Sequence, residues 1–297
     1  MCPWEENEAS FPPHQRKNRD VAEEKITVKS FIKFKQRKEK IAILTAYDFF
    51  TARILDQIGM DSILVGDSVN MVFYGSPNTL SISMDQMIYH TKAVSSAVKR
   101  ALIIGDMPFL SYQASTQEAV SNAGRFLKEG GAGAVKIEGG LEMADTIKRI
   151  IEVGIPVMGH IGLTPQSINR FGGYVVRGKS EEEKKYLLES AKKLEQVGCF
   201  SVLVESVPKK LAQEITESLK VPTIGIGAGT GCDGQVLVVN DILGLFEDFK
   251  PKFVRRYAEL GKEIRKACQN YLNDVKSGRF PSEEESYQQN SKLKKQK

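Results

Sequence analysis

The sequence contains little cysteine, histidine and tryptophan, and it lacks a long apolar run. Its 297 residues include four cysteines, three histidines and one tryptophan. No apolar run approaches the roughly 18 residues that a membrane-spanning helix needs, so we expect no membrane association. The cysteines show no CxxC spacing, and we expect them to be reduced thiols of a cytoplasmic protein. They are Cys2, Cys199, Cys232 and Cys268.

A strongly basic surface is also missing. The formal net charge is +5, and no basic stretch is interspersed with aromatic residues, so we do not expect nucleic-acid binding. Residues 1–25 mix acids, bases and prolines without the apolar core of a secretory signal, and we expect a disordered extension there. Residues 288–297 are expected to form a basic polar tail.

The sequence does contain eight short apolar segments, most of them separated by helical patterns. Such an alternation predicts parallel strands joined by right-handed crossovers, and eight of them predict a closed (β/α)8 barrel of the TIM type. We expect this barrel to span residues 26–287, with an N-terminal helix near 28–38 and C-terminal helices near 251–277. The expected strands are 41–47, 62–68, 102–107, 134–138, 157–160, 201–205, 222–226 and 235–239.

Four of these strands end in or beside an acid. Glu205 ends one of them, and the other three acids belong to successive strands of the chain. Side chains alternate along a strand, so each acid is expected to share a face with the residue two positions before it. These pairs are Val65 with Asp67, Ile104 with Asp106, and Lys136 with Glu138. A single acid at a strand end is best interpreted as the cap of the next helix. Three acids on matching faces instead indicate a ligand site at the carboxyl end of the barrel.

Carboxylates grouped in this way suggest a magnesium site. Two or three of them suit Mg²⁺, which keeps water or substrate oxygens in its remaining positions. A metal that holds a 2-oxo acid stabilises the enolate formed when the neighbouring carbon loses a proton. Glu205, at the end of a strand further around the barrel, is a candidate base because burial would raise its pKa. Lys136 could offset carboxylate charge.

Other interpretations of these residues remain open. Lys136 and Glu138 could form only a buried ion pair within one strand. His160 could hydrogen-bond to the backbone and do nothing else, or it could be an accessory or rival base, since its ordinary pKa lies near neutrality. The run Gly225–Gly229 resembles a phosphate-cradling turn, but it would equally serve close packing after a seventh strand.

Several runs together resemble one family. They are Thr45–Asp48, Val65–Ser68, Tyr89–Thr91, Val135–Gly140, Gly159–Gln166, Val204–Glu205, Gly225–Gly229, Cys232–Gln235 and Phe280–Glu285. In order and approximate spacing they are similar to the ketopantoate hydroxymethyltransferases, from about Ile26 to about Tyr287. One departure is Asn240, where the family commonly has histidine; asparagine does not titrate near neutral pH, so a proton-relay role there is in doubt.

The resemblance implies a Mg²⁺-dependent barrel enzyme of pantothenate biosynthesis. Such enzymes transfer a one-carbon unit from 5,10-methylenetetrahydrofolate to 3-methyl-2-oxobutanoate and give 2-dehydropantoate. It also implies a homodecamer of two stacked five-membered rings. By the same resemblance Asp67, Asp106 and Glu138 hold the metal, and Glu205 accepts the proton. The oxo-acid contacts are Asp67, Ser68, Asp106 and Lys136.

Two alternative functions stay open. One is a Mg²⁺-dependent carbon–carbon lyase of the isocitrate lyase and phosphoenolpyruvate mutase type. Those enzymes usually depend on a cysteine in a mobile loop, and this sequence has no cysteine between Cys2 and Cys199. The other is a metabolite-binding barrel without chemistry, against which the intact set of acids argues.

Overall fold

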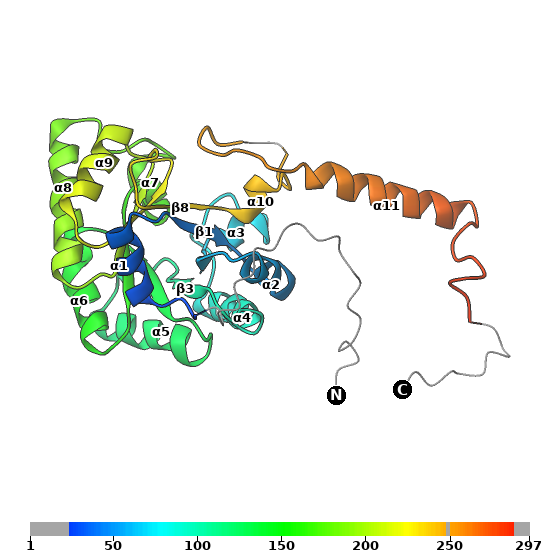
Figure 1. Cartoon of the computed structure of the whole chain (residues 1–297), viewed down its shortest axis with the longest axis horizontal. Coiled ribbons are helices and arrows are strands. Elements are labelled where there is room, and N and C mark those ends of the chain that lie inside the picture. The colour runs from blue at the N-terminus through cyan, green and yellow to red at the C-terminus, as the bar shows by residue number, and fades with distance from the viewer. Residues whose placement is uncertain (1–23, 248–249, 288–297) are drawn as a thin grey trace.

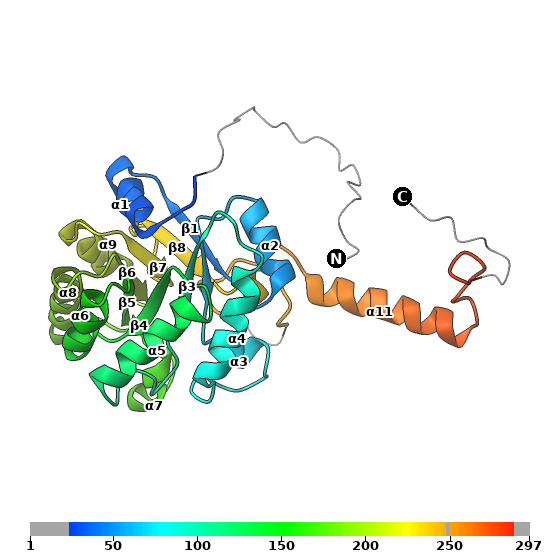
Figure 2. The same cartoon turned by 90° about the horizontal axis from the view of Figure 1, so that it is seen from below.

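The computed structural model describes residues 24–247 and 250–287. Eight parallel strands close into a barrel in chain order, with β8 pairing β1 (Figures 1 and 2). The predicted (β/α)8 fold is therefore confirmed. The strands are β1 (Ile41–Thr45), β2 (Ser62–Val65), β3 (Leu102–Asp106), β4 (Ala134–Glu138), β5 (Val157–Gly162), β6 (Ser201–Glu205), β7 (Thr223–Ile226) and β8 (Gly234–Leu237).

Helices follow most strands and cover the outside of the barrel (Figure 2). They are α2 (Phe49–Gln57), α3 (Val69–Val72), α4 (Met84–Ser95), α5 (Thr116–Lys128), α6 (Ala144–Glu152), α7 (Ile168–Phe171), α8 (Glu181–Gln196), α9 (Lys209–Ser218) and α10 (Val239–Ile242), with the short 3₁₀ turns η1 (Leu141–Met143) and η2 (Pro165–Ser167). Four helix starts are fixed by side-chain caps that accept a backbone N–H three residues ahead. The capping residues are Asp48, Ser83, Ser115 and Ser180.

The apolar residues of the strands form two cores. One lies inside the barrel and contains Leu64, Ile104 and Leu203. The other lies between the barrel and its helices, and contains Ile63 and Val65 together with apolar helix residues. Both faces of the strands from β2 to β7 are covered, so these strands read as near-continuous apolar runs in the sequence. The outer faces of β1 and β8 are partly open, at Ala42 and Gln235.

One helix, α1 (Val28–Arg37), closes the amino end of the barrel. Its Phe31 is fully buried and joins the interior core, where its ring packs edge-on against Phe200 at 5.4 Å between centroids. Lys35 anchors the helix by an ion pair of 2.9 Å to Asp233. The N-terminal helix predicted at 28–38 is confirmed, and the opposite, carboxyl end of the barrel is left for a ligand.

The C-terminal prediction is wrong in detail. Within residues 250–287 the structure shows one helix, α11 (Leu260–Lys276), in place of helices from 251, and this helix extends away from the barrel (Figures 1 and 2). None of its residues is buried. The extension expected at 1–25 and the tail at 288–297 lie almost entirely outside the described residues. No helix in the described ranges has both the length and the apolar character to span a membrane.

Candidate active site

Asp67 reaches the mouth of the barrel by a different route from the one expected. Its predicted face partner Val65 points outward to the helices, and Leu64 points inward. Strict alternation would therefore have turned Asp67 away from the interior. The strand ends at Val65, however, and the chain turns at Gly66. Asp67 is buried there, and its backbone N–H donates to Asp106 Oδ2 at 3.0 Å.

The other charged residues lie on interior faces, as predicted. The barrel register places Asp106 beside Lys136 and Glu138 beside His160 on neighbouring strands. Lys136 Nζ is 2.8 Å from Asp106 Oδ1 and 3.5 Å from Glu138 Oε1. The lysine thus pairs more closely with Asp106 than with Glu138, so the interpretation of an ion pair confined to one strand does not describe it.

His160 connects this cluster to Glu205. Lys136 Nζ lies 3.2 Å from His160 Nδ1. An ammonium group only donates, so Nδ1 accepts and the proton of the neutral ring is on Nε2. His160 Nε2 is 3.2 Å from Glu205 Oε2, but it is not aligned for a hydrogen bond. His160 therefore faces side chains of the site, and the interpretation of a histidine bonded only to backbone does not describe it.

Ser68 is placed at the same mouth. It follows Asp67 and is half-buried, with its Oγ 2.8 Å from the hydroxyl of the buried Tyr47. The carbonyl of Tyr47 is in turn 2.7 Å from His90 Nδ1. His90 is buried in α4 and supports the backbone of residue 47 from behind, in agreement with a packing role.

Burial changes the pKa of every acid in the cluster. It raises the pKa of Asp67 to about 6, and those of Asp106 and Glu138 to about 7. Burial also raises the pKa of Glu205, while it lowers that of His160. For Lys136, burial alone would lower the pKa, but the adjacent carboxylates outweigh it and hold the lysine charged.

The cluster contains more negative than positive charge. Three buried carboxylates, Asp67, Asp106 and Glu138, surround one ammonium, that of Lys136. Asp106 Oδ1 is buried and forms no aligned hydrogen bond to the described part of the chain. That oxygen is held only by the ion pair of 2.8 Å with Lys136 Nζ. Three carboxyl groups beside a single ammonium fit a divalent cation, whose charge would also favour their ionised forms.

The three acids are not equally available to a metal. Glu138 Oε1 lies near Lys136 and His160, and its Oε2 accepts from the backbone N–H of Gln166 at 2.9 Å. Among the described residues, no three Asp, Glu, His or Cys side chains are arranged to enclose a cation together. Glu138 therefore has a contact on each of its oxygens, which disfavours direct ligation by this residue.

A family model described as ketopantoate hydroxymethyltransferase matches residues 25–283. The chain belongs to this family. The 3-methyl-2-oxobutanoate hydroxymethyltransferase of Clostridium botulinum (strain Alaska E43 / Type E3) is 53% identical to it, covering 89% of this chain and 96% of its own. That of Geobacter metallireducens is 54% identical, covering 89% of this chain and 98% of its own.

Solved structures with the same barrel come from enzymes of lower similarity. Phosphonopyruvate hydrolase in complex with oxalate and Mg²⁺ has a TM-score of 0.57 at 12% identity, covering 84% of this chain and 87% of its own. A 2,3-dimethylmalate lyase has a TM-score of 0.56 at 15% identity, covering 88% and 92%. At such identities these structures show the shared fold alone.

In this ketopantoate hydroxymethyltransferase family member, the sequence predicted no role for two buried residues of the mouth, Gln166 and Tyr112. Gln166 ends the run Gly159–Gln166, and Tyr112 belongs to none of the runs that resemble the family. Both lie in loops after strands, Tyr112 after β3 and Gln166 in η2, where no periodic pattern reveals which way a side chain points. The contacts of Gln166 with Glu138 and Asp67 form between segments far apart in the chain, so only the three-dimensional structure reveals them.

The glycine run after β7 is explained by close packing. A Cβ on Gly229 would lie 2.8 Å from Lys209 Cβ, and one on Gly225 would lie 3.0 Å from Cys232 Sγ. Gly227 and Gly229 also have positive φ, where glycine is favoured. These approaches account for the glycines without a phosphate.

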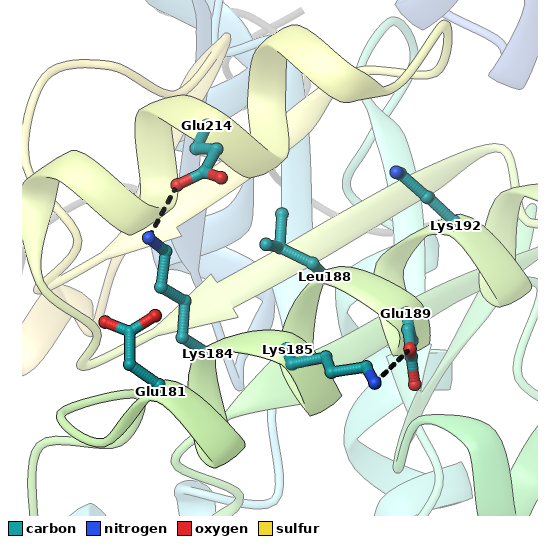
Figure 3. Close-up of a pocket in the computed structure, with 7 residues that line it drawn as sticks. All are labelled: Glu181, Lys184, Lys185, Leu188, Glu189, Lys192 and Glu214. Carbon is teal, nitrogen blue, oxygen red and sulfur yellow. Dashed lines mark ion pairs between the residues drawn. The ribbon is translucent and has the colours of Figure 1, made fainter.

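A shallow surface pocket between α8 and α9 belongs to a different part of this family member. Its lining is charged and includes the ion pairs Lys184–Glu214 at 3.5 Å and Lys185–Glu189 at 3.9 Å (Figure 3). These side chains are largely solvated and none belongs to the predicted site. The candidate site therefore stays at the barrel mouth.

Proposed function

We propose that the chain transfers a hydroxymethyl group from 5,10-methylenetetrahydrofolate to 3-methyl-2-oxobutanoate and gives 2-dehydropantoate, in pantothenate biosynthesis. The observation that carries the proposal is the buried cluster at the barrel mouth, in which one lysine lies among acids and a histidine leads to Glu205. The names of relatives at 53–54% identity support the substrate.

The proposed cofactor is Mg²⁺, held directly by Asp67 and Asp106 and by Glu138 through water. Bound there, the ion would act as a Lewis acid toward the keto oxygen of the oxo acid. The contacts proposed for the oxo acid are Asp67, Asp106, Ser68 Oγ and Lys136 Nζ. Lys136 is suited to this because its neighbours keep it charged, so it attracts the substrate carboxylate.

The proposed base is Glu205, which removes the proton from C3 of the oxo acid. Burial raises its pKa above that of an ordinary glutamate, which makes its carboxylate a stronger base. His160 is a weaker candidate because burial lowers its pKa and Lys136 occupies its Nδ1. In this arrangement His160 Nε2 lies beside Glu205 Oε2, at 3.2 Å. The resulting enolate attacks the methylene carbon of the folate. The two C–N bonds of that carbon break, the folate nitrogens leave as tetrahydrofolate, and water supplies the oxygen of the new hydroxymethyl group.

Proton exchange tests both the function and the base. In D₂O without folate, the native protein should wash the C3 proton out of 3-methyl-2-oxobutanoate, which NMR detects. Glu205→Gln keeps the shape but removes the basic charge, so we expect washout to fall by about 10²-fold or more. If Glu205→Gln exchanges at the native rate while His160→Gln does not, the base is His160.

A second experiment tests the metal. Asp106→Ala should remove Mg²⁺ binding and turnover, because it deletes an oxygen ligand from a site with few others. Isothermal titration with Mg²⁺ measures the binding, and circular dichroism should show that the barrel remains folded. Native Mg²⁺ affinity in Asp106→Ala would refute this ligand.

The alternative functions lack a specific observation in their favour. The 2,3-dimethylmalate lyase shares the fold with this chain at 15% identity, which does not extend to its chemistry. Turnover with 3-methyl-2-oxobutanoate and methylenetetrahydrofolate separates transferase, lyase and binding protein in one assay. A cytoplasmic location is part of the proposal, and the free thiols of Cys199, Cys232 and Cys268 are in keeping with it.

A further inference from the structure

Gln166 occupies the centre of the acid cluster. It belongs to η2, directly after β5, and only 5% of its surface is exposed. Its side chain lies between groups that come from the turn after β2 and from the loop after β3. Its backbone contacts a group of β4. One residue thus connects three neighbouring parts of the barrel mouth.

Every hydrogen-bonding position of the Gln166 amide is used. The Nε2 group donates to Asp67 Oδ2 and to the carbonyl of Met107, both at 2.9 Å. The Oε1 atom accepts from the Tyr112 hydroxyl at 2.7 Å and from Gln113 Nε2 at 3.1 Å. A side-chain amide has two donors and two acceptor positions, so the set is complete.

The contacts fix which way the amide faces. The Met107 carbonyl can only accept, so the NH₂ end must point toward it and toward Asp67. A flipped amide would place Oε1 against two acceptors and the NH₂ against the NH₂ of Gln113. The orientation is therefore determined by the surrounding groups.

Gln166 also contacts the second acid through its backbone. Its N–H donates to Glu138 Oε2 at 2.9 Å. The same residue thus holds one oxygen each of Asp67, which follows β2, and of Glu138, the last residue of β4. The remaining oxygen of Asp67, Oδ1, stays outside the reach of the amide.

We propose that Gln166 is a positioning residue for the metal site: its amide holds Asp67 Oδ2 so that Asp67 Oδ1 faces the cation, and Tyr112 holds the amide in turn. This inference rests on the proposed function, because it takes Asp67 as a metal ligand. It assigns Gln166 no contact with substrate or metal. Residues that orient ligands in this way typically change metal affinity by 10–100-fold when they are replaced.

The experiment measures metal binding in the absence of substrate. Mn²⁺ binding is followed by electron paramagnetic resonance and Mg²⁺ binding by isothermal titration, for the native protein, Gln166→Met and Gln166→Leu. Both variants replace the amide by an apolar side chain of similar size and so remove the donor to Asp67. We expect dissociation constants raised by about 10-fold or more for both ions.

Gln113→Met is the matched control. It removes one hydrogen bond to the same amide, at Oε1, but none to a carboxylate. We expect its metal affinity to stay within about 3-fold of native, since donors to the ligating carboxylate set the affinity. A loss in Gln113→Met as large as in Gln166→Met would mean general loosening and would overturn the proposal, as would native affinity in Gln166→Met.

Two further measurements keep the test decisive. If these Gln166 variants do not fold, Gln166→Asn keeps a polar amide at the position but is one methylene shorter, which withdraws the donor from Asp67. Its metal affinity should still fall by at least 3-fold, and native affinity there overturns the proposal. A native protein that fails to bind Mn²⁺ or to exchange the C3 proton would refute the proposed function itself. If the native protein binds Mn²⁺ and exchanges the C3 proton, and Gln166→Met has the native metal affinity, only the role of Gln166 is refuted.

Discussion

Because Gly162 has no side chain, the end of β5 can lie against the backbone of Glu205, the proposed base. The φ of Gly162 is +97°, and a Cβ there would lie only 2.2 Å from the carbonyl oxygen of Glu205. That oxygen accepts the N–H of Leu163 at 2.9 Å. A side chain at 162 must therefore displace the backbone of Glu205, and a shift of about 1 Å in a catalytic group costs on the order of 10²-fold in rate.

We therefore expect Gly162→Ala to lower the C3 proton washout by 10-fold or more. Gly154→Ala is the control, because Gly154 has a similar φ of +94° with nothing within 4 Å of its Cβ position. It carries the same conformational penalty without a steric clash at the site. Equal washout in the two variants would contradict a steric role for position 162.

The cysteines give a second prediction for single residues. Burial raises the pKa of Cys199 to about 12, so at pH 8 its reactive thiolate is almost absent. We expect iodoacetamide at pH 8 to leave Cys199 unmodified in the folded protein and to modify it once urea unfolds the chain. Peptide mass spectrometry reads the outcome, and rapid modification of folded Cys199 would show that its site opens.

At the scale of the elements, helix α1 packs against the barrel core mainly through one side chain, that of Phe31. Phe31 is fully buried at the amino end of the barrel. Replacing a buried phenylalanine by alanine costs about 3–5 kcal/mol, since it loses apolar burial and leaves a cavity. We expect Phe31→Ala to lower the apparent free energy of unfolding in urea by that amount. Lys33→Ala, exposed on the same helix, should change it by less than about 0.5 kcal/mol.

The elements differ in how far the sequence predicts them. Apolar runs and helix caps were enough to predict eight strands, α1 and the closed barrel. The interior position of Asp106, Lys136, Glu138, His160 and Glu205 followed from alternation because their strands continue to these residues or stop beside them. Alternation failed for Asp67, because β2 ends two residues earlier and the turn at Gly66 decides the direction of the side chain.

The remaining part of the site depends on loops. Gln166 and Tyr112 are placed by tertiary hydrogen bonds between segments separated by 54 residues. Such contacts have no periodic signature, so a single sequence does not reveal them. The same holds for α11, whose start at Leu260 and departure from the barrel were not predicted.

At the scale of the whole molecule, we propose that α11 packs against another copy of the chain, within a homodecamer. Leu260, Ile264, Cys268, Tyr271 and Val275 recur at helical spacing, and together they form an exposed stripe, called here the α11 stripe. An apolar stripe that the barrel does not cover is typical of an interface. The decamer itself rests on the family resemblance.

Analytical ultracentrifugation tests the assembly. We expect a species of about ten chains for the native protein at micromolar concentration, and a smaller species for Ile264→Glu, because a buried charge opposes association. Lys266→Glu lies on the opposite face of α11 and should leave the mass unchanged. A native monomer of 33.0 kDa would refute the assembly. Cys268 should be alkylated faster in Ile264→Glu than in native protein.

The pairing of β8 with β1 has a consequence for synthesis on the ribosome. One side of β1 finds its partner only when Gly234–Leu237 emerges, although β1 itself is completed at Thr45. At about 5–20 residues per second, the interval is roughly 10–40 seconds. Throughout that time the nascent chain presents an open strand edge, which can pair with other chains. We therefore expect new chains to depend on chaperones until the last strand is made.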